Sequence, residues 1–246
     1  MSLEILFILL GCLLVVSFLY STVGHAGASG YIAVMSLMGF APDFIKPAAL
    51  VLNIGVAAIA SWQYFRAGHF QWGLFWPFAA FSVPGAFIGG YLSIPVHVFK
   101  IILGLILLFS AMVIIARLKA IEKTAAPSVS LSMGVGGVLG FLAGLTGTGG
   151  GIFLTPMMIL FKWAGTKTAS ATSALFILVN SISGLLGFLS TGEGFPPART
   201  LAPLLLTVLI GGATGSYLGS RKLSKEIVKI CLSCVLLIAS AKLLFG

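Results

Sequence analysis

The sequence predicts an all-α polytopic membrane protein made of two inverted repeats. Three observations support this prediction: a scarcity of charge, long apolar runs, and landmarks that recur in both halves. Only 8% of the 246 residues are charged and 59% are hydrophobic, whereas a soluble domain carries roughly 25% charged residues at its surface. A surface this poor in charge has to face lipid, and the runs are too uniformly apolar for the alternating strands of a membrane barrel.

Two uncharged runs of equal length, residues 5–42 and 124–161, open the two halves of the chain. Each is long enough to enter the bilayer and return, and each has a glycine-rich break near its middle. We therefore expect a broken or re-entrant helical hairpin in each half. Three transmembrane helices should follow each hairpin, which makes eight to ten hydrophobic segments in all; the predicted runs are 47–65, 72–93, 98–117, 168–190, 199–219 and 226–245.

Landmarks follow the same order in both halves, so we expect a first repeat at residues 1–120 and a second at residues 121–246. The paired landmarks are Gly24-His25-Ala26-Gly27 with Gly147-Thr148-Gly149-Gly150, Asn53 with Asn180, and Gly85-x-x-x-Gly89 with Gly211-x-x-x-Gly215. Small residues spaced by four let membrane helices touch, so the last pair is predicted to serve packing. Because each half makes an odd number of net crossings, the second half should be inverted relative to the first.

The positive-inside rule sets the orientation. With the central loop in the cytoplasm, ten of the 14 basic residues fall on the cytoplasmic side and four fall outside. Both termini are then predicted to lie outside. Since topology explains the net charge of +9, we expect the lipid bilayer as a partner and no nucleic acid. The cytoplasmic set is Arg66, Arg117, Lys119, Lys123, Lys162, Lys167, Arg221, Lys222, Lys225 and Lys229, and the outer set is Lys46, Lys100, Arg199 and Lys242.

The two glycine breaks are the candidate binding site. A new helix should begin after each, near Ala28 and near Ile152, and its first amides have no intrahelical partner and carry the positive end of the helix dipole. Glycines let a ligand approach such amides, and neither break contains Lys, Arg, Asp or Glu, so the predicted ligand is a small anion. Corresponding breaks in inverted halves are typical of the substrate site of a transporter. The predicted substrate-binding residues are Gly24, His25, Ala26, Gly27, Ser29, Asn53, Thr146, Gly147, Thr148, Gly149, Gly150, Gly151 and Asn180.

Several roles stay open. Asn53 and Asn180 either coordinate the substrate or cap the broken backbone of the neighbouring hairpin. His25 either carries a proton or donates a hydrogen bond to the anion. For the breaks themselves, close helix packing is the alternative to ligand binding.

No catalytic residue, metal or cofactor is predicted. Hydrolysis needs acid, base or metal-binding groups gathered in a cleft, whereas the five acidic residues avoid the centres of the apolar segments and the three histidines are scattered. Cys231 and Cys234 form a single Cys-x-x-Cys within an apolar run, where packing within the lipid is favoured over metal or redox use. An anion channel and an integral-membrane hydrolase are the alternatives to a carrier.

The segment Gly144-Leu145-Thr146-Gly147-Thr148-Gly149-Gly150-Gly151, followed by Pro156, resembles the sulfite exporter TauE/SafE family, also called TSUP transporters. The duplicated halves and the chain length agree with this resemblance, although Ala33 stands in the first half where Pro156 stands in the second. The resemblance implies a secondary transporter of sulfite or an organosulfonate in a bacterial inner membrane. Alternating access around a midplane site is the mechanism that we expect, and a homodimer is left open.

Overall fold

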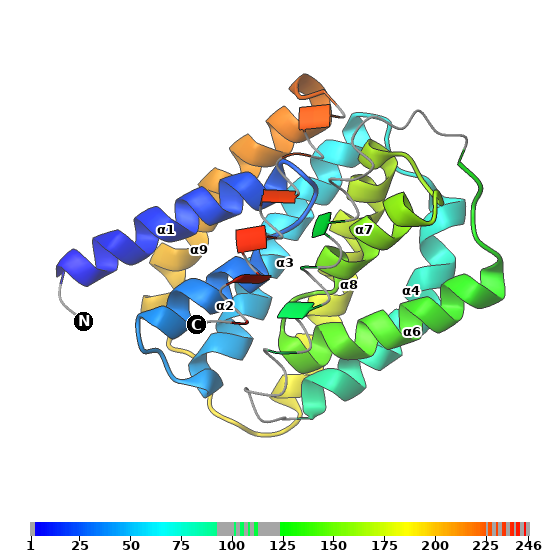
Figure 1. Cartoon of the computed structure of the whole chain (residues 1–246). Helices are drawn as coiled ribbons and strands as arrows, with labels where there is room; N and C mark the ends of the chain where they lie inside the picture. Colours follow the sequence, from blue (N-terminus) through cyan, green and yellow to red (C-terminus); the bar gives the residue numbers. More distant parts are fainter. Residues whose placement is uncertain are drawn as a thin grey trace.

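The computed structural model describes residues 3–92 and 124–224, together with parts of 101–112 and 226–244. The described chain is helical, as expected, and contains no strand (Figure 1). The predicted runs 98–117 and 226–245, the latter with Cys231, lie largely outside the described residues. The elements are α1 (Leu3–Ser21), α2 (Ala28–Leu37), α3 (Pro42–Arg66), α4 (Trp72–Tyr91), α6 (Val129–Thr146), α7 (Gly151–Leu160), α8 (Thr166–Leu189), α9 (Ala198–Tyr217) and a π-helical turn, η1 (Leu218–Lys222).

Six of the described helices are long and apolar enough to cross a membrane, namely α1, α3, α4, α6, α8 and α9, the last together with η1. Large apolar side chains project from their outer faces: Phe7, Leu206 and Ile210 are 63–66% exposed. A soluble protein rarely exposes a continuous apolar surface of this kind. The chain is therefore a multi-pass membrane protein whose apolar perimeter faces lipid.

Each half opens with a broken hairpin, as the sequence predicts. The segment 22–27 separates α1 from α2, and Gly147–Gly150 separates α6 from α7. In the first hairpin, α2 returns along α1, since Gly30 lies against Val16 and the Tyr20 and Ser29 hydroxyls are 2.9 Å apart. Both α2 and α7 have ten residues, so each is about 15 Å long and does not cross a ~30 Å bilayer core alone.

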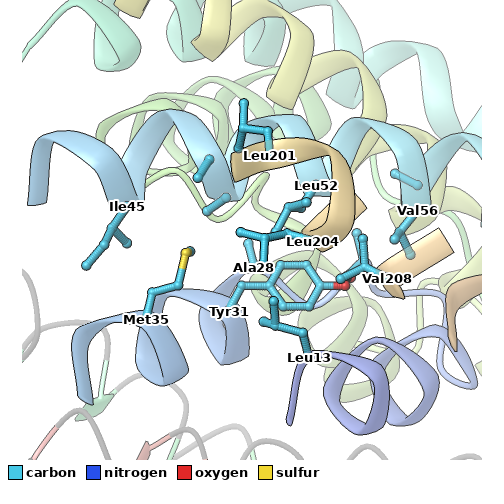
Figure 2. Packing of buried hydrophobic residues seen from close by; sticks show 14 of the residues in the cluster. Leu13, Ala28, Tyr31, Met35, Ile45, Leu52, Val56, Leu201, Leu204 and Val208 are labelled. Carbon is cyan, nitrogen blue, oxygen red and sulfur yellow. Dashed lines mark hydrogen bonds between the residues drawn. The ribbon is translucent and has the colours of Figure 1, made fainter. Parts of the chain in front are cut away.

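Two buried clusters hold the short helices in place. Figure 2 shows the cluster around α2, in which the ring of Tyr31 lies between side chains of three other helices; its members include Leu13 of α1, Ala28, Tyr31 and Met35 of α2, Leu52 and Val56 of α3, and Leu204 and Val208 of α9. The second cluster surrounds α7 and includes Ile152, Phe153, Leu154, Met158 and Ile159 of that helix with Phe78 of α4 and Phe176 of α8. Each short helix is thus fixed by apolar contacts along its length.

The helices of the two halves pair in a reciprocal pattern. Helix α1 contacts α9 and α6 contacts α4, while α3 contacts α9 and α8 contacts α4. Helices α3 and α8 also contact each other. They run antiparallel, because Lys46 near the start of α3 lies 5.9 Å from the ring of Phe188 near the end of α8, whereas Asn53 meets Ser181.

The predicted packing glycines lie where helices touch most closely. Gly85 and Gly89 of α4 lie against the backbone of α6, and Gly211 and Gly215 of α9 lie against the backbone of α1. A side chain at any of the four would overlap backbone atoms of the neighbouring helix. This confirms the packing role that their spacing predicts.

Lys167 lies next to the segment that carries Arg221 and Lys222, with which it is predicted to share a side. Lys167 Nζ and His69 Nε2 both contact the carbonyl oxygen of Ser220, at 3.3 and 3.0 Å. Lys46 lies at the opposite end, where its Nζ donates to the carbonyl oxygens of Gly90 and Leu92, both at 2.9 Å. This grouping agrees with the predicted topology, while the side that faces the cytoplasm stays a prediction.

Replacing Gly144 by Ala should force α4 away from α6, because a Cβ there would overlap the carbonyl oxygen of Ala86. Overpacking of this kind costs about 1–3 kcal/mol, so we expect the Tm in detergent to fall by roughly 3–10 °C. Gly134→Ala is the matched control, since Gly134 is exposed on the same helix with nothing within 4 Å of a Cβ. Equal Tm values for the two variants would contradict the close α4–α6 contact.

Candidate functional site

Glycines in the left-handed region shape both breaks. Gly24 and Gly147 follow the ends of α1 and α6 with φ of +76° and +73°, and Gly27 and Gly150 precede α2 and α7 with φ of +106° and +79°. Residues with a Cβ avoid this region, so glycine is required for both turns. The two breaks therefore have the same local construction.

The short helices begin where the sequence predicts. Helix α2 starts at Ala28, and α7 starts at Gly151, one residue before the predicted Ile152. No side chain caps either N-terminus. The first amides of both helices are therefore left for another hydrogen-bond acceptor.

His25 links the first break to the second half of the chain. Its Nε2 lies 2.9 Å from Oγ1 of Thr155 in α7, and Thr155 donates in turn to Oγ of Ser173 in α8 at 2.7 Å. Since the single Thr155 proton goes to Ser173, the Thr155 oxygen accepts from the Nε2–H of His25. The other ring nitrogen, Nδ1, is buried without a hydrogen-bond partner.

The second break lies against α3 and α8. A Cβ on Gly149 would stand 2.7 Å from Ile177 Cγ2, 2.8 Å from Ser181 Oγ and 3.0 Å from Asn53 Nδ2. Asn53 Nδ2 also donates to Ser181 Oγ at 3.5 Å, whereas Asn53 Oδ1 has no partner. The backbone of this break is thus in direct contact with a buried amide and a buried hydroxyl.

Several buried polar atoms of the described residues, some of them next to the breaks, have no hydrogen-bond partner. Asn180 is fully buried, and neither its Oδ1 nor its Nδ2 is hydrogen-bonded. A buried polar group without a partner lowers the free energy of unfolding by about 1–3 kcal/mol. Atoms of this kind therefore indicate a ligand or water that forms hydrogen bonds with them in function. The side chains concerned are Ser21, His25, Asn53, Ser61, Ser170, Thr172 and Asn180.

Other predicted site residues stabilise the breaks themselves. The hydroxyls of Thr146 and Thr148 are 2.7 Å apart, and the Thr148 amide donates to Thr146 Oγ1 at 3.3 Å. The Ser29 hydroxyl forms a hydrogen bond with the Tyr20 hydroxyl, and the Tyr31 hydroxyl donates to the carbonyl oxygen of Ala26. In the state described, these hydroxyls bond to protein atoms, and their contact with a substrate stays a prediction.

The predicted residues form two groups at different depths. The first break meets α8 at Ser170, against which Gly24 lies, and the second meets α8 from Ser173, next to Gly151, to Ser181, next to Gly149. Positions three to eleven residues apart on a helix are about 4–17 Å apart. His25, with Thr155 and Ser173, lies where these levels adjoin.

Three residues near the breaks were not predicted from the sequence to bind substrate. Ser173 and Ser181 lie on the face of α8 that meets the second break, one helical turn on either side of Ile177. Because residues four apart share a helix face, their spacing from Ile177 is the sequence feature that indicates a common face. Lys46, assigned above only to topology, lies beside the second break, since its Cγ and carbonyl oxygen would both be 3.4 Å from a Cβ on Gly147.

Comparison with known proteins gives a consistent set of relatives. A family model described as Sulfite exporter TauE/SafE matches residues 9–243. The probable membrane transporter protein y4hK of Sinorhizobium fredii is 38% identical over 238 residues, which cover 94% of this chain and 95% of that protein. The probable membrane transporter protein YunE of Bacillus subtilis is 25% identical, with coverage of 80% and 78%. A probable membrane transporter protein of Methanocaldococcus jannaschii is 26% identical, with coverage of 93% for both chains. No solved structure gives a significant match.

Replacing Thr155 by Val should destabilise the protein, because it leaves the Nε2–H of buried His25 without an acceptor. The expected cost is about 1–3 kcal/mol. Thr214→Val is the matched control, since Thr214 is exposed on α9 and its hydroxyl bonds only to carbonyl oxygens of its own helix. We expect the Tm in detergent to fall for Thr155→Val and to stay near the parent value for Thr214→Val. Indistinguishable Tm values would contradict the His25–Thr155–Ser173 chain.

Proposed function

Because the chain belongs to the sulfite exporter TauE/SafE family of membrane transporters, we propose that it carries sulfite or an organosulfonate across the membrane. The transported ion is a compact oxyanion, bound between the broken hairpins and released by alternating access. A bacterial inner membrane is the proposed location. The chain acts as a carrier and not as an enzyme.

The observation that carries this proposal is the uncapped N-terminus of α7 behind the left-handed glycines of the second break. Its free amides and the helix dipole favour an anion. Asn180 adds a buried donor, Nδ2, that has no protein partner, and Asn53 Nδ2 donates to Ser181 and keeps a second N–H. Neither break contains a carboxylate that would repel an anion.

The neutral character of the breaks favours transport over tight binding. A fixed ion pair with Arg or Lys would hold an oxyanion strongly, whereas amides and hydroxyls bind it through dipoles. Conduction and transport need a ligand that leaves as readily as it enters. Lys46, at the outer edge of the second break, is placed to attract an anion without holding it at the centre.

Two features of the helix arrangement support alternating access between inverted halves. Corresponding helices α3 and α8 run antiparallel through the centre, as a twofold axis in the membrane plane requires. The contacts α1–α9 and α6–α4 also correspond when the halves are exchanged. Two equivalent halves around one path allow inward-facing and outward-facing states of similar energy.

The test of substrate and site is uptake of labelled sulfite by purified protein in liposomes. Asn180→Leu should reduce uptake at least about tenfold, which corresponds to roughly 1.4 kcal/mol. Because the amide has no protein partner, an apolar side chain of similar size should leave the Tm unchanged or raise it. Thr207→Val is the control, since Thr207 bonds only to the carbonyl oxygen of Pro203 in its own helix.

Normal uptake by Asn180→Leu would show that Asn180 does not bind the substrate. Failure of the parent protein to move sulfite, sulfoacetate or any related oxyanion would refute the proposed substrate class. A carrier should also show saturable uptake, whereas currents far above carrier turnover in a planar bilayer would identify a channel instead.

The proposed orientation can be tested by labelling single cysteines in cells, with Cys12, Cys231 and Cys234 replaced by Ser. Gly194→Cys, in the exposed loop beyond α8, should react with a membrane-impermeant maleimide in intact cells. Gln71→Cys, in the exposed loop before α4, should react only after permeabilisation. The reverse pattern would invert the proposed topology.

A further inference from the structure

The side chain of Ile177 covers the backbone of the second break. Ile177 is 2% exposed, and its Cγ2 would be 2.7 Å from a Cβ on Gly149. Its Cγ1 would be 2.5 Å from a Cβ on Gly151, and its Cδ1 would overlap that Cβ. An apolar side chain therefore rests on the backbone that leads into α7, whose amides the proposed function assigns to the anion.

Polar groups flank this side chain one helical turn away in each direction. Toward the start of α8 lies Ser173, joined through Thr155 to His25. Toward the end of α8 lies Ser181, joined to Asn53. Along one face of α8, polar Ser173, apolar Ile177 and polar Ser181 therefore follow one another at intervals of four residues.

Each flanking group keeps one hydrogen-bonding atom free. Asn53 Nδ2 carries a second N–H besides the one it gives to Ser181, so it can still donate, whereas the unpartnered Oδ1 of Asn53 and Nδ1 of His25 are acceptors. Farther toward the start of α8, Ser170 Oγ is also unpartnered and lies next to Gly24 of the first break. Donors available to an anion therefore occur on both sides of Ile177, which apolar packing alone does not require.

We infer that Ile177 is a hydrophobic gate that separates two half-sites on the path of the anion. The outer half-site consists of Gly149, Asn53 and Ser181, at the end of the bundle that carries Lys46. The inner half-site consists of His25 and Ser173, with Thr155 between them. This inference rests on the proposed function and names the residue that divides its site.

The physical basis is the cost of moving an ion past an apolar side chain. At Ile177 no group replaces the water or hydrogen bonds that the anion leaves behind, so the closed position blocks passage. Isoleucine in a helix is nearly restricted to one χ1 rotamer. The gate therefore opens when α8 shifts relative to α7, which uncovers the α7 amides, and not when the side chain rotates alone.

Flux measurements in liposomes test the gate. Ile177→Ala should raise sulfite flux about fivefold or more, because a barrier step loses roughly 1 kcal/mol or more. Ile159→Ala removes the same atoms from a buried position of α7 outside the path, and its flux should not rise. Ile177→Phe should reduce flux about tenfold or more while sulfite still shifts the Tm.

A second readout does not depend on which anion is carried. Ser170→Cys, in a chain without the native cysteines, is exposed to 2-sulfonatoethyl methanethiosulfonate from the side that carries Lys46. With Ile177 present, we expect the introduced thiol to be protected from the reagent. In the Ile177→Ala background the thiol should react, whereas Ile159→Ala should leave it protected.

The outcomes separate the gate from the substrate. If Ile177→Ala matches Ile159→Ala in both flux and labelling, the gate is refuted while sulfite transport by the parent stands. If labelling changes as expected but the parent moves no sulfite or sulfonate, the gate is supported and the proposed substrate fails.

Discussion

A helix that breaks inside a bilayer leaves backbone groups that lipid cannot satisfy, and the rest of this structure is arranged around two such breaks. The protein covers both of them with other helices and supplies local partners. The Tyr64 hydroxyl donates to the carbonyl oxygen of Thr22 at 2.8 Å, and the Tyr31 hydroxyl donates to that of Ala26. In the second break the backbone amide of Thr148 donates a hydrogen bond to the Thr146 hydroxyl. The amides that remain uncapped, at the start of α2 and α7, are the exception on which the proposed function depends.

Close glycine contacts join the outer helices in pairs, and they also join α8 to α4, where Gly90 lies against Gly184 and Gly187 against Phe87. Backbone meets backbone where α4 touches α6 and where α9 touches α1, so those pairs have little room for side-chain adjustment. Between them, α3 and α8 meet through side chains, as where Asn53 donates to Ser181. The unpartnered polar side-chain atoms of the described core lie on these two helices, in the first break and at the end of α1. Rigid pairs around an incompletely bonded centre suit the alternating access proposed above.

Among the described residues that contact one another, the charged ones lie toward the two ends of the bundle and not beside its buried centre. Lys167 and His69 meet near Ser220 at one end, while Lys46 caps carbonyl oxygens at the other. Around the breaks, the groups available to the proposed ligand are amides, hydroxyls and the imidazole of His25. In the proposed function, such a distribution draws anions toward the protein through long-range attraction, while short-range hydrogen bonds at the centre bind them and are readily broken.

The sequence by itself determined the features that depend on local chemistry. Charge gaps located the spans, and glycine runs located both breaks and the starts of α2 and α7 to within one residue, because glycine and helix termini act within a few neighbours. Only the tertiary structure decided which residues meet across the breaks. His25 and Thr155 are 130 positions apart, and Ile177 reaches Gly149 only because α8 packs against α7. Contacts of this kind arise when helices that are distant in the sequence pack together. Composition and local propensity do not indicate which helices will do so.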